Sequence, residues 1–105
     1  MKKTPRVQKP VKTLVIYYPK KGKERQLSAL IKKHWRTLHK LGLATNEPAV
    51  VYQAKDGHSN KTIFVEIFSW KDSKASSLAH STPEVMAIWN PMMPILETMS
   101  HSTVK

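Results

Sequence analysis

The stretch TIFVEIFSW (residues 62–70) decides the fold of this 105-residue chain, because it reads as a strand with two apolar faces. Its β-branched and aromatic residues are typical of a β-strand. Side chains alternate along a strand, so one face carries Ile63, Val65 and Ile67, and the other carries Phe64, Glu66, Phe68 and Trp70. Such a strand has to be covered on both sides. One layer of helices covers only one of them.

Further strands are predicted before and after this segment. The runs VKTLVIYY (11–18) and AVVYQA (49–54) have the length and composition of strands. The second run is joined to residues 62–70 by a turn that carries Asp56-Gly57, which predicts an antiparallel hairpin. The last residues, TMSHSTVK (98–105), predict a short fourth strand.

A helix is predicted over residues 23–41, between the first two strands. At about 100° per residue, its apolar side chains fall within one arc of about 140°. The members of this arc are Leu27, Leu30, Ile31, His34, Trp35, Leu38 and Leu41. Basic residues lie on the opposite side, and Gly42 follows where a left-handed cap is expected.

Two shorter helices are predicted after residue 70. Asp72 can cap a helix that runs through His80, and Thr82-Pro83-Glu84 is a second helix start. Pro91 and Pro94 are then expected to break or kink the chain. The order of elements predicts an α+β, ferredoxin-like β-α-β-β-α-β fold with an antiparallel sheet. A second copy related by a two-fold axis is the simplest cover for the other sheet face.

Composition restricts the class of protein. A single domain is predicted over residues 12–105, after a flexible basic arm at 1–11. The chain contains no cysteine, which excludes disulfides, thiolate catalysis and cysteine-ligated metals. Its five histidines have no familiar ligand spacing, so no metal site is expected. No apolar run approaches membrane-spanning length, so we expect a cytoplasmic protein without a membrane partner.

The charge is concentrated in the first part of the chain. Residues 1–40 carry thirteen Lys or Arg and one acidic residue, whereas residues 41–105 carry five Lys and six acidic residues. This asymmetry is compatible with a nucleic-acid surface. A solvated arm and the outer face of one helix explain it more simply, so nucleic acid is the least favoured partner.

The segment FVEIFSWKDSKASSLAHSTPEVMAIW (64–89) resembles the dimeric α+β barrel superfamily, in particular its antibiotic-biosynthesis-monooxygenase-like group. The similar features are the apolar strand that ends at Trp70, the Trp-Lys-Asp step into a helix, the Ala79-His80 pair and the Pro-Glu-Val-Met sequence. The resemblance implies a homodimer whose two sheets face each other, with a cleft between sheet and helices in each monomer.

The resemblance also implies a choice of chemistry. Some members of the group oxidise polycyclic phenols without metal or flavin, and others degrade haem. Haem-degrading members use an Asn on the first strand and a Trp and a His on the last helical segment. Here the first strand has no Asn, and the two helix positions are Ala79 and Trp89. We therefore expect no cofactor.

His80 is the candidate catalytic residue, because imidazole can accept a proton near neutral pH. The alternative is a histidine that ends a helix, where a cation interacts favourably with the helix dipole. Trp70, Trp89 and Met86 are candidates for the wall of a site for a flat apolar ligand, although such residues more often only pack in the core.

Glu66 is predicted to be buried between Phe64 and Phe68, where an ionised carboxylate needs a partner. The partner predicted for it is His34, in a pair that is either structural or part of the binding site. Tyr17 and Tyr18 point to opposite faces of the first strand, so one of them faces the cleft.

These features support three hypotheses. The first is a cofactor-independent monooxygenase that acts on an aromatic or polyketide-like small molecule. The second is a non-catalytic dimer that binds a small ligand or is structural. The third is a nucleic-acid-associated protein that uses the basic first part of the chain.

Overall fold

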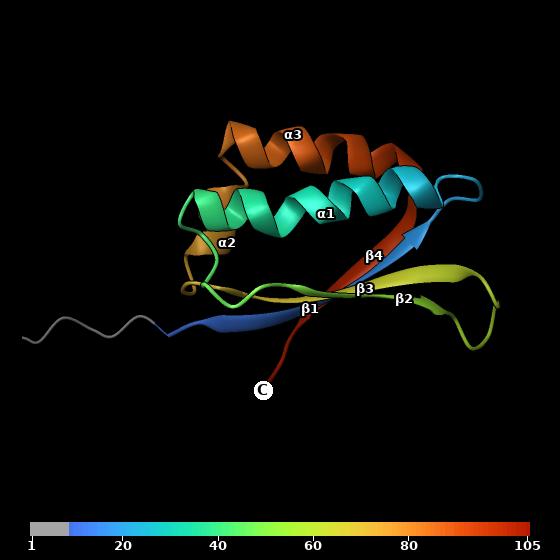
Figure 1. The fold of residues 1–105 in the computed structure, drawn as a ribbon, viewed down its shortest axis with the longest axis horizontal. Helices are drawn as coiled ribbons and strands as arrows, with labels where there is room; N and C mark the ends of the chain where they lie inside the picture. The colour runs from blue at the N-terminus through green and yellow to red at the C-terminus, as the bar shows by residue number, and fades with distance from the viewer. Residues whose placement is uncertain (1–8) are drawn as a thin grey trace, which may run out of the picture.

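The computed structural model describes residues 9–105 and shows a four-stranded sheet with helices on one face (Figure 1). Its elements are β1 Val11–Pro19, α1 Glu24–Lys40, β2 Val50–Lys55, β3 Thr62–Trp70, α2 Ala75–Ala79, α3 Pro83–Met92, a 3₁₀ turn Met93–Ile95 and β4 Leu96–Thr103. This order confirms the predicted β-α-β-β-α-β arrangement. The predicted basic arm at 1–11 lies outside the described residues except for its last three, of which Val11 begins β1.

The sheet has the strand order β2-β3-β1-β4 with antiparallel neighbours. In the middle of the sheet, Val15 of β1 lies opposite Glu66 on one side and His101 on the other. The strand predicted at 98–105 is therefore real, but it begins at Leu96 and ends at Thr103. It pairs with β1 along most of its length, so it is a full member of the sheet.

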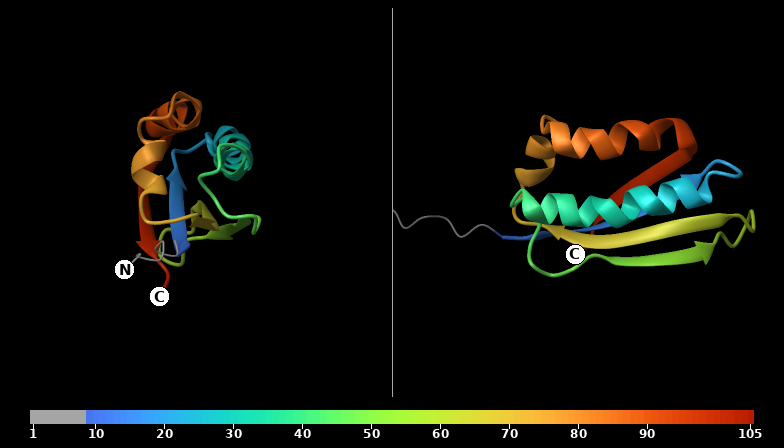
Figure 2. Two further views of the ribbon diagram at one scale, coloured as in Figure 1. Left: turned by 90° about the vertical axis from the view of Figure 1, so that its left-hand side faces the viewer. Right: turned by 45° about the horizontal axis from the view of Figure 1, so that its top comes forward.

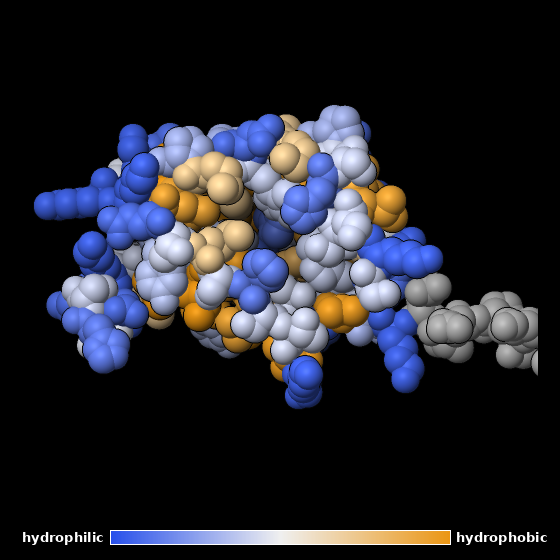
Figure 3. Space-filling model, turned by 180° about the vertical axis from the view of Figure 1, so that it is seen from behind, coloured by the Kyte–Doolittle hydropathy of each residue, from blue (hydrophilic) through white to orange (hydrophobic). Residues whose placement is uncertain are grey.

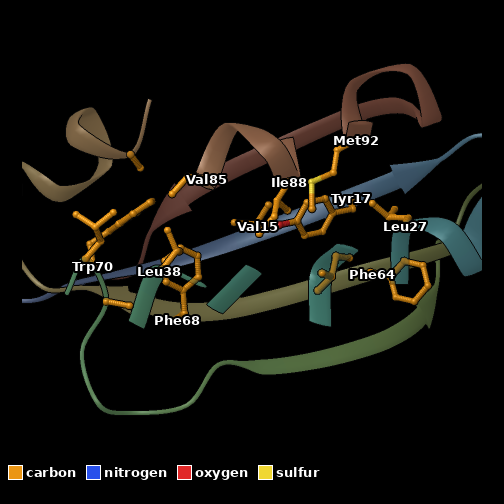
Figure 4. Close-up of a cluster of buried hydrophobic side chains, with 14 of the residues drawn as sticks. Val15, Tyr17, Leu27, Leu38, Phe64, Phe68, Trp70, Val85, Ile88 and Met92 are labelled. Atoms are coloured by element: carbon orange, nitrogen blue, oxygen red, sulfur yellow. The ribbon is translucent and has the colours of Figure 1, made fainter. Parts of the chain in front are cut away.

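The core lies between the sheet and the helices (Figure 4). Tyr17 of β1 and Phe68 of β3 are buried there against Leu38 of α1 and Ile88 of α3. Each fully buried side chain of this size contributes about 1.5–3 kcal/mol relative to exposure. The same alternation places Glu66 inside this core.

The end of α1 confirms the cap expected from the sequence. Gly42 has φ of +75°, the left-handed region that glycine adopts readily. The Leu43 N–H donates to the Leu38 carbonyl at 2.8 Å, and the Gly42 N–H donates to the His39 carbonyl at 3.0 Å. These two bonds form a Schellman motif, which ends the helix and turns the chain toward β2.

The last two helices differ from expectation at their boundaries. α2 begins only at Ala75, because Asp72 Oδ1 accepts the N–H groups of Lys74 and Ala75 and holds the preceding turn. Pro91 does not break α3, which continues to Met92. The hydrogen bond that Pro91 lacks would reach the carbonyl of Ala87, an exposed residue whose carbonyl group water can satisfy.

The second face of the sheet carries no helix (Figure 2). This face carries Leu14, Ile16 and Tyr18 of β1 and Val65 and Ile67 of β3. Side chains alternate along each strand, and Leu14 pairs with Ile67 and Ile16 with Val65. On β2 the side chains of Val50 and Tyr52 continue the same face and are 46% and 57% exposed. Ile63 is buried at the end of the row, and the other β3 members are half-buried. We call these eight residues the outer sheet face.

Across the described residues, every helix is too short or too polar to cross a membrane.

Candidate functional site

A cavity of about 610 Å³ lies between the helix-covered side of the sheet and the helices α2 and α3. Side chains of β1 and β4 form one wall, and side chains of α2, α3 and the end of β3 form the others. Figure 3 shows the molecule from the side on which α3 and β4 lie, and the surface there is hollowed between apolar groups. This volume is in the range of sites that enclose drug-sized ligands.

The walls are mainly aromatic and thioether groups. Phe68, Trp70 and Trp89 supply the aromatic surface. Every methionine in residues 9–105 lines the cavity, namely Met86, Met92, Met93 and Met99. Thioether side chains adapt to irregular ligand shapes. The cavity therefore suits a flat apolar molecule whose outline need not be matched by a rigid wall.

Three imidazoles are among the polar groups of the lining, those of His34, His80 and His101. His80 is exposed at the end of α2, and its Nδ1–H donates to the Ser76 carbonyl oxygen at 2.9 Å. Because a carbonyl only accepts, neutral His80 keeps Nε2 free as an acceptor. The His80 ring stands edge-on to Trp89, with ring centroids 4.8 Å apart.

His101 of β4 is another of these imidazoles, and sequence reasoning missed it as a site residue. It lies opposite Val15 in the sheet and so shares the helix-covered side with Tyr17 and Met99. A correct register for the fourth strand would have revealed this, because alternate residues from Met99 onward then face the cavity. The uncertain start of that strand concealed the signal.

A buried hydrogen-bond network underlies the cavity. Glu66 is 0% exposed, and its Oε1 accepts the Tyr17 hydroxyl at 2.6 Å. His34 is 3% exposed, and its Nδ1 lies 3.0 Å from Oε1 and 3.1 Å from Oε2 of Glu66. The Trp89 Nε1–H donates to His34 Nε2 at 2.9 Å. The predicted pair of Glu66 and His34 is therefore present.

The network determines the tautomer of His34. An indole nitrogen can only donate, so His34 Nε2 is an acceptor without a proton. Neutral imidazole then carries its proton on Nδ1 and donates it to the Glu66 carboxylate. Burial, and then the nearby charge of Glu66, raise the pKa of Tyr17 far above its usual range, so its hydroxyl stays protonated as a donor.

The structure brings most of the predicted site residues to one place. Trp70, His80, Trp89, Tyr17, His34 and Met86 all line the cavity. Glu66 lies behind the wall and reaches the site through Tyr17 and His34. Tyr18 does not join them, because it lies on the outer sheet face. The strand alternation that separates the two tyrosines leaves Tyr17 as the one at the cavity.

The fold can be compared with known proteins. No protein-family model matches the chain, and no curated protein does either. Solved structures do match: a protein from Shewanella oneidensis has a TM-score of 0.71 at 12% identity, over 92% of this chain and 90% of that one.

Two further matches bear names that indicate an activity of those proteins. SnoaB, a cofactor-independent oxygenase from Streptomyces nogalater that was solved as a mutant, has a TM-score of 0.66 at 13% identity, over 90% of this chain and 91% of that one. An antibiotic biosynthesis monooxygenase has a TM-score of 0.68 at 12% identity, over 90% and 96% of the two chains. At such identities the similarity is one of fold. The chain therefore has the same ferredoxin-like α+β fold as these structures, which is the fold that the resemblance of residues 64–89 implied.

Proposed function

We propose that the protein binds a flat aromatic or polyketide-like molecule in the cavity and oxidises it as a cofactor-independent monooxygenase. The observation that carries this proposal is the cavity of about 610 Å³, which combines aromatic and thioether walls with the imidazoles of His80 and His101. The fold shared with a cofactor-independent oxygenase supports the type of reaction.

In this reaction the ligand itself supplies the electrons. A base removes the proton of a phenolic or enolic hydroxyl, and the resulting anion reacts with O₂ at a CH₂ carbon of the same conjugated ring system. One CH₂ group and one O₂ molecule give one carbonyl group and one water, so the ligand is the only reductant. The protein has to accept the proton, hold the anion and exclude water.

The side chains divide these tasks between them. Trp70 and Trp89 hold the flat ring, and Met86 adapts to its edge. His80 serves as base or anchor, because its Nε2 is free and its ring is held by the bond to Ser76. Because these side chains line a cavity, their placement favours a ligand-binding role over one in which they only fill the core.

The proposal includes a homodimer formed through the outer sheet face. This face is apolar over three strands and is left uncovered by the helices. A second copy related by a two-fold axis covers it with the same residues, which is the commonest arrangement in homodimers.

Replacing His80 tests the proposal. His80→Ala should barely change the unfolding free energy, since the side chain is exposed. It should lower O₂ uptake with a polycyclic phenol that carries a CH₂ group in its ring system, or the affinity for 2-naphthol, by more than about tenfold, which corresponds to roughly 1.4 kcal/mol. Oxygen-electrode assays, fluorescence titration and urea unfolding measure these quantities.

The matched control is His39→Ala, since His39 is also an exposed histidine but does not line the cavity. It should leave uptake and affinity unchanged. Trp70→Phe keeps most of the ring volume and should weaken binding without unfolding the protein. A destabilised His80→Ala protein that binds 2-naphthol like the parent would show that His80 is structural.

A further inference from the structure

The bond between Trp89 and His34 is one of the points at which the buried network meets the cavity, the other being Tyr17. Both residues line the cavity, and both belong to the network, whereas Glu66 lies entirely behind it. His34 is held from two sides: Glu66 of β3 accepts its Nδ1–H, and Phe68 of β3 meets its ring edge-on at 5.4 Å. A histidine whose Nδ1–H is bound to a buried carboxylate is oriented to use Nε2 as a base.

In the structure, His34 Nε2 is occupied by the indole N–H of Trp89 at 2.9 Å. Trp89 is the more accessible partner, since it is half-buried and His34 is 3% exposed. A ligand group that separates the two side chains has to satisfy both, because an unpaired buried donor or acceptor costs about 1–3 kcal/mol. It must accept from Trp89 and donate to His34 at once.

A hydroxyl group meets this requirement, and an ether oxygen does not. A hydroxyl has one donor and two acceptor positions, so it can accept the Trp89 N–H and donate to His34 Nε2. An ether oxygen only accepts, and would leave the lone pair of His34 Nε2 without a partner. The network therefore discriminates between ligands of nearly equal shape.

We propose that a phenolic or enolic hydroxyl of the ligand inserts between Trp89 Nε1 and His34 Nε2, and that His34 is the base that accepts its proton. The proposal rests on the function given above, because it requires an aromatic ligand in the cavity. It assigns the base to His34 and leaves His80 as an anchor.

The proton transfer leaves every group of the network paired. The O–H bond breaks, an N–H bond forms at His34 Nε2, and the electron pair stays on the ligand oxygen. That oxyanion accepts from both Trp89 Nε1 and His34 Nε2, while the imidazolium donates Nδ1–H to Glu66. Preorganised donors around a developing oxyanion are an effective form of electrostatic stabilisation. Glu66 balances the positive charge that His34 gains.

Matched ligands test the proposal on the intact protein. 2-Naphthol and 2-methoxynaphthalene share the same ring, but only the first can donate a hydrogen bond. We expect 2-naphthol to bind at least about tenfold more tightly, the factor that corresponds to one unsatisfied buried acceptor. Calorimetric titration of both ligands gives the ratio of their dissociation constants.

Variants locate the origin of that ratio. His34→Phe should abolish the preference while still binding 2-methoxynaphthalene, and His39→Phe, on the same helix but away from the cavity, should keep it. If His34→Phe fails to fold because Glu66 loses a donor, His34→Lys decides the question. Its ammonium group can still donate to Glu66 but has no acceptor, so the preference should be lost in this variant as well.

The outcomes separate this inference from the proposed function. Binding of neither ligand would contradict the proposed function, and with it the inference. Equal binding of both would support an aromatic site and overturn the insertion of a hydroxyl. A preference that survives in His34→Phe, or in His34→Lys where His34→Phe does not fold, would show that the hydroxyl does not donate to His34, and His34 would not be the base. Its loss in His80→Ala would then place the hydroxyl at His80.

Discussion

At the scale of single residues, the unusual feature is a carboxylate with no exposure to solvent. Glu66 is tolerated because Tyr17 and His34 both donate to it. Hydrogen bonds to a charged acceptor contribute about 1.5–3 kcal/mol each, and an unpaired buried charge costs more than that. The same two donors form part of the cavity wall. Stability and site geometry are therefore coupled at this position.

Tyr17→Phe should lower the unfolding free energy at neutral pH by about 1–3 kcal/mol, since it removes one donor from Glu66 and leaves the ring in place. Urea unfolding at constant pH measures the change. Tyr18→Phe, on the outer sheet face, is the matched control and should be close to neutral.

Tyr17 also leads to a prediction about the stability of the protein at alkaline pH. Burial and Glu66 raise the pKa of Tyr17 in the folded state, whereas an unfolded tyrosine titrates near about pH 10. The folded state thus keeps a proton that the unfolded state releases. The contribution of Tyr17 to the unfolding free energy is complete below about pH 10. Above that pH it declines by up to about 1.4 kcal/mol per pH unit. Urea unfolding at several pH values measures this decline. If the unfolding free energies of the wild type and of Tyr17→Phe fell equally with pH above about pH 10, the raised pKa of Tyr17 would be contradicted.

At the scale of elements, boundaries depend on local backbone chemistry. The Schellman motif ends α1 at the expected glycine, and Asp72 delays the start of α2 by holding the turn before it. In the β2–β3 turn, the residue with positive φ is Asn60, at +62°, and not the glycine of the Asp56-Gly57 pair. The sequence identified that this turn exists, but not which residue takes the left-handed conformation.

Gly42→Ala should destabilise the protein by about 1 kcal/mol, because a left-handed backbone is unfavourable for alanine. No atom lies within 4 Å of the Cβ position, so the cost comes from the backbone alone. Gly57→Ala is the control, since Gly57 has no positive φ and also has open space around it. Thermal unfolding of the two variants compares them directly. Equal melting temperatures would mean that the cap does not stabilise α1.

At the scale of the whole molecule, the sheet divides the chain into a covered and an uncovered side. The covered side holds the core, the network and the cavity, and the uncovered side is the apolar outer sheet face. The basic side chains of α1 point away from its buried residues into solvent. This exposed helix face carries five of the thirteen basic residues in the first forty positions.

We expect a dimer of two 12.0 kDa chains at micromolar concentration, formed through the outer sheet face. Val65→Lys places a charge at the centre of that face and should produce a monomer in light scattering. Leu78→Lys introduces the same charge at an exposed leucine of α2, and should leave the dimer intact. A wild-type protein that remains monomeric at high concentration would contradict the dimer.

The sequence by itself determined the elements and their order, because the periods of apolar residues are local properties of a helix or strand. It also determined that Glu66 is buried, since neighbouring apolar residues on the same strand face show this directly. The pairing with His34 followed because that residue is a polar member of the apolar arc of α1.

Only the tertiary structure decided which side chains meet across elements. The bond from Trp89 to His34 joins residues 55 positions apart, and no periodicity in the sequence relates them. His101 enters the cavity only through the register of β4 on β1, and the side of the sheet that the helices cover decides that Tyr17, and not Tyr18, lines it. Such contacts depend on how strands align and how helices pack over them. The physical reason is that alignment minimises the free energy of the whole assembly of elements, whereas each local pattern is compatible with several alignments.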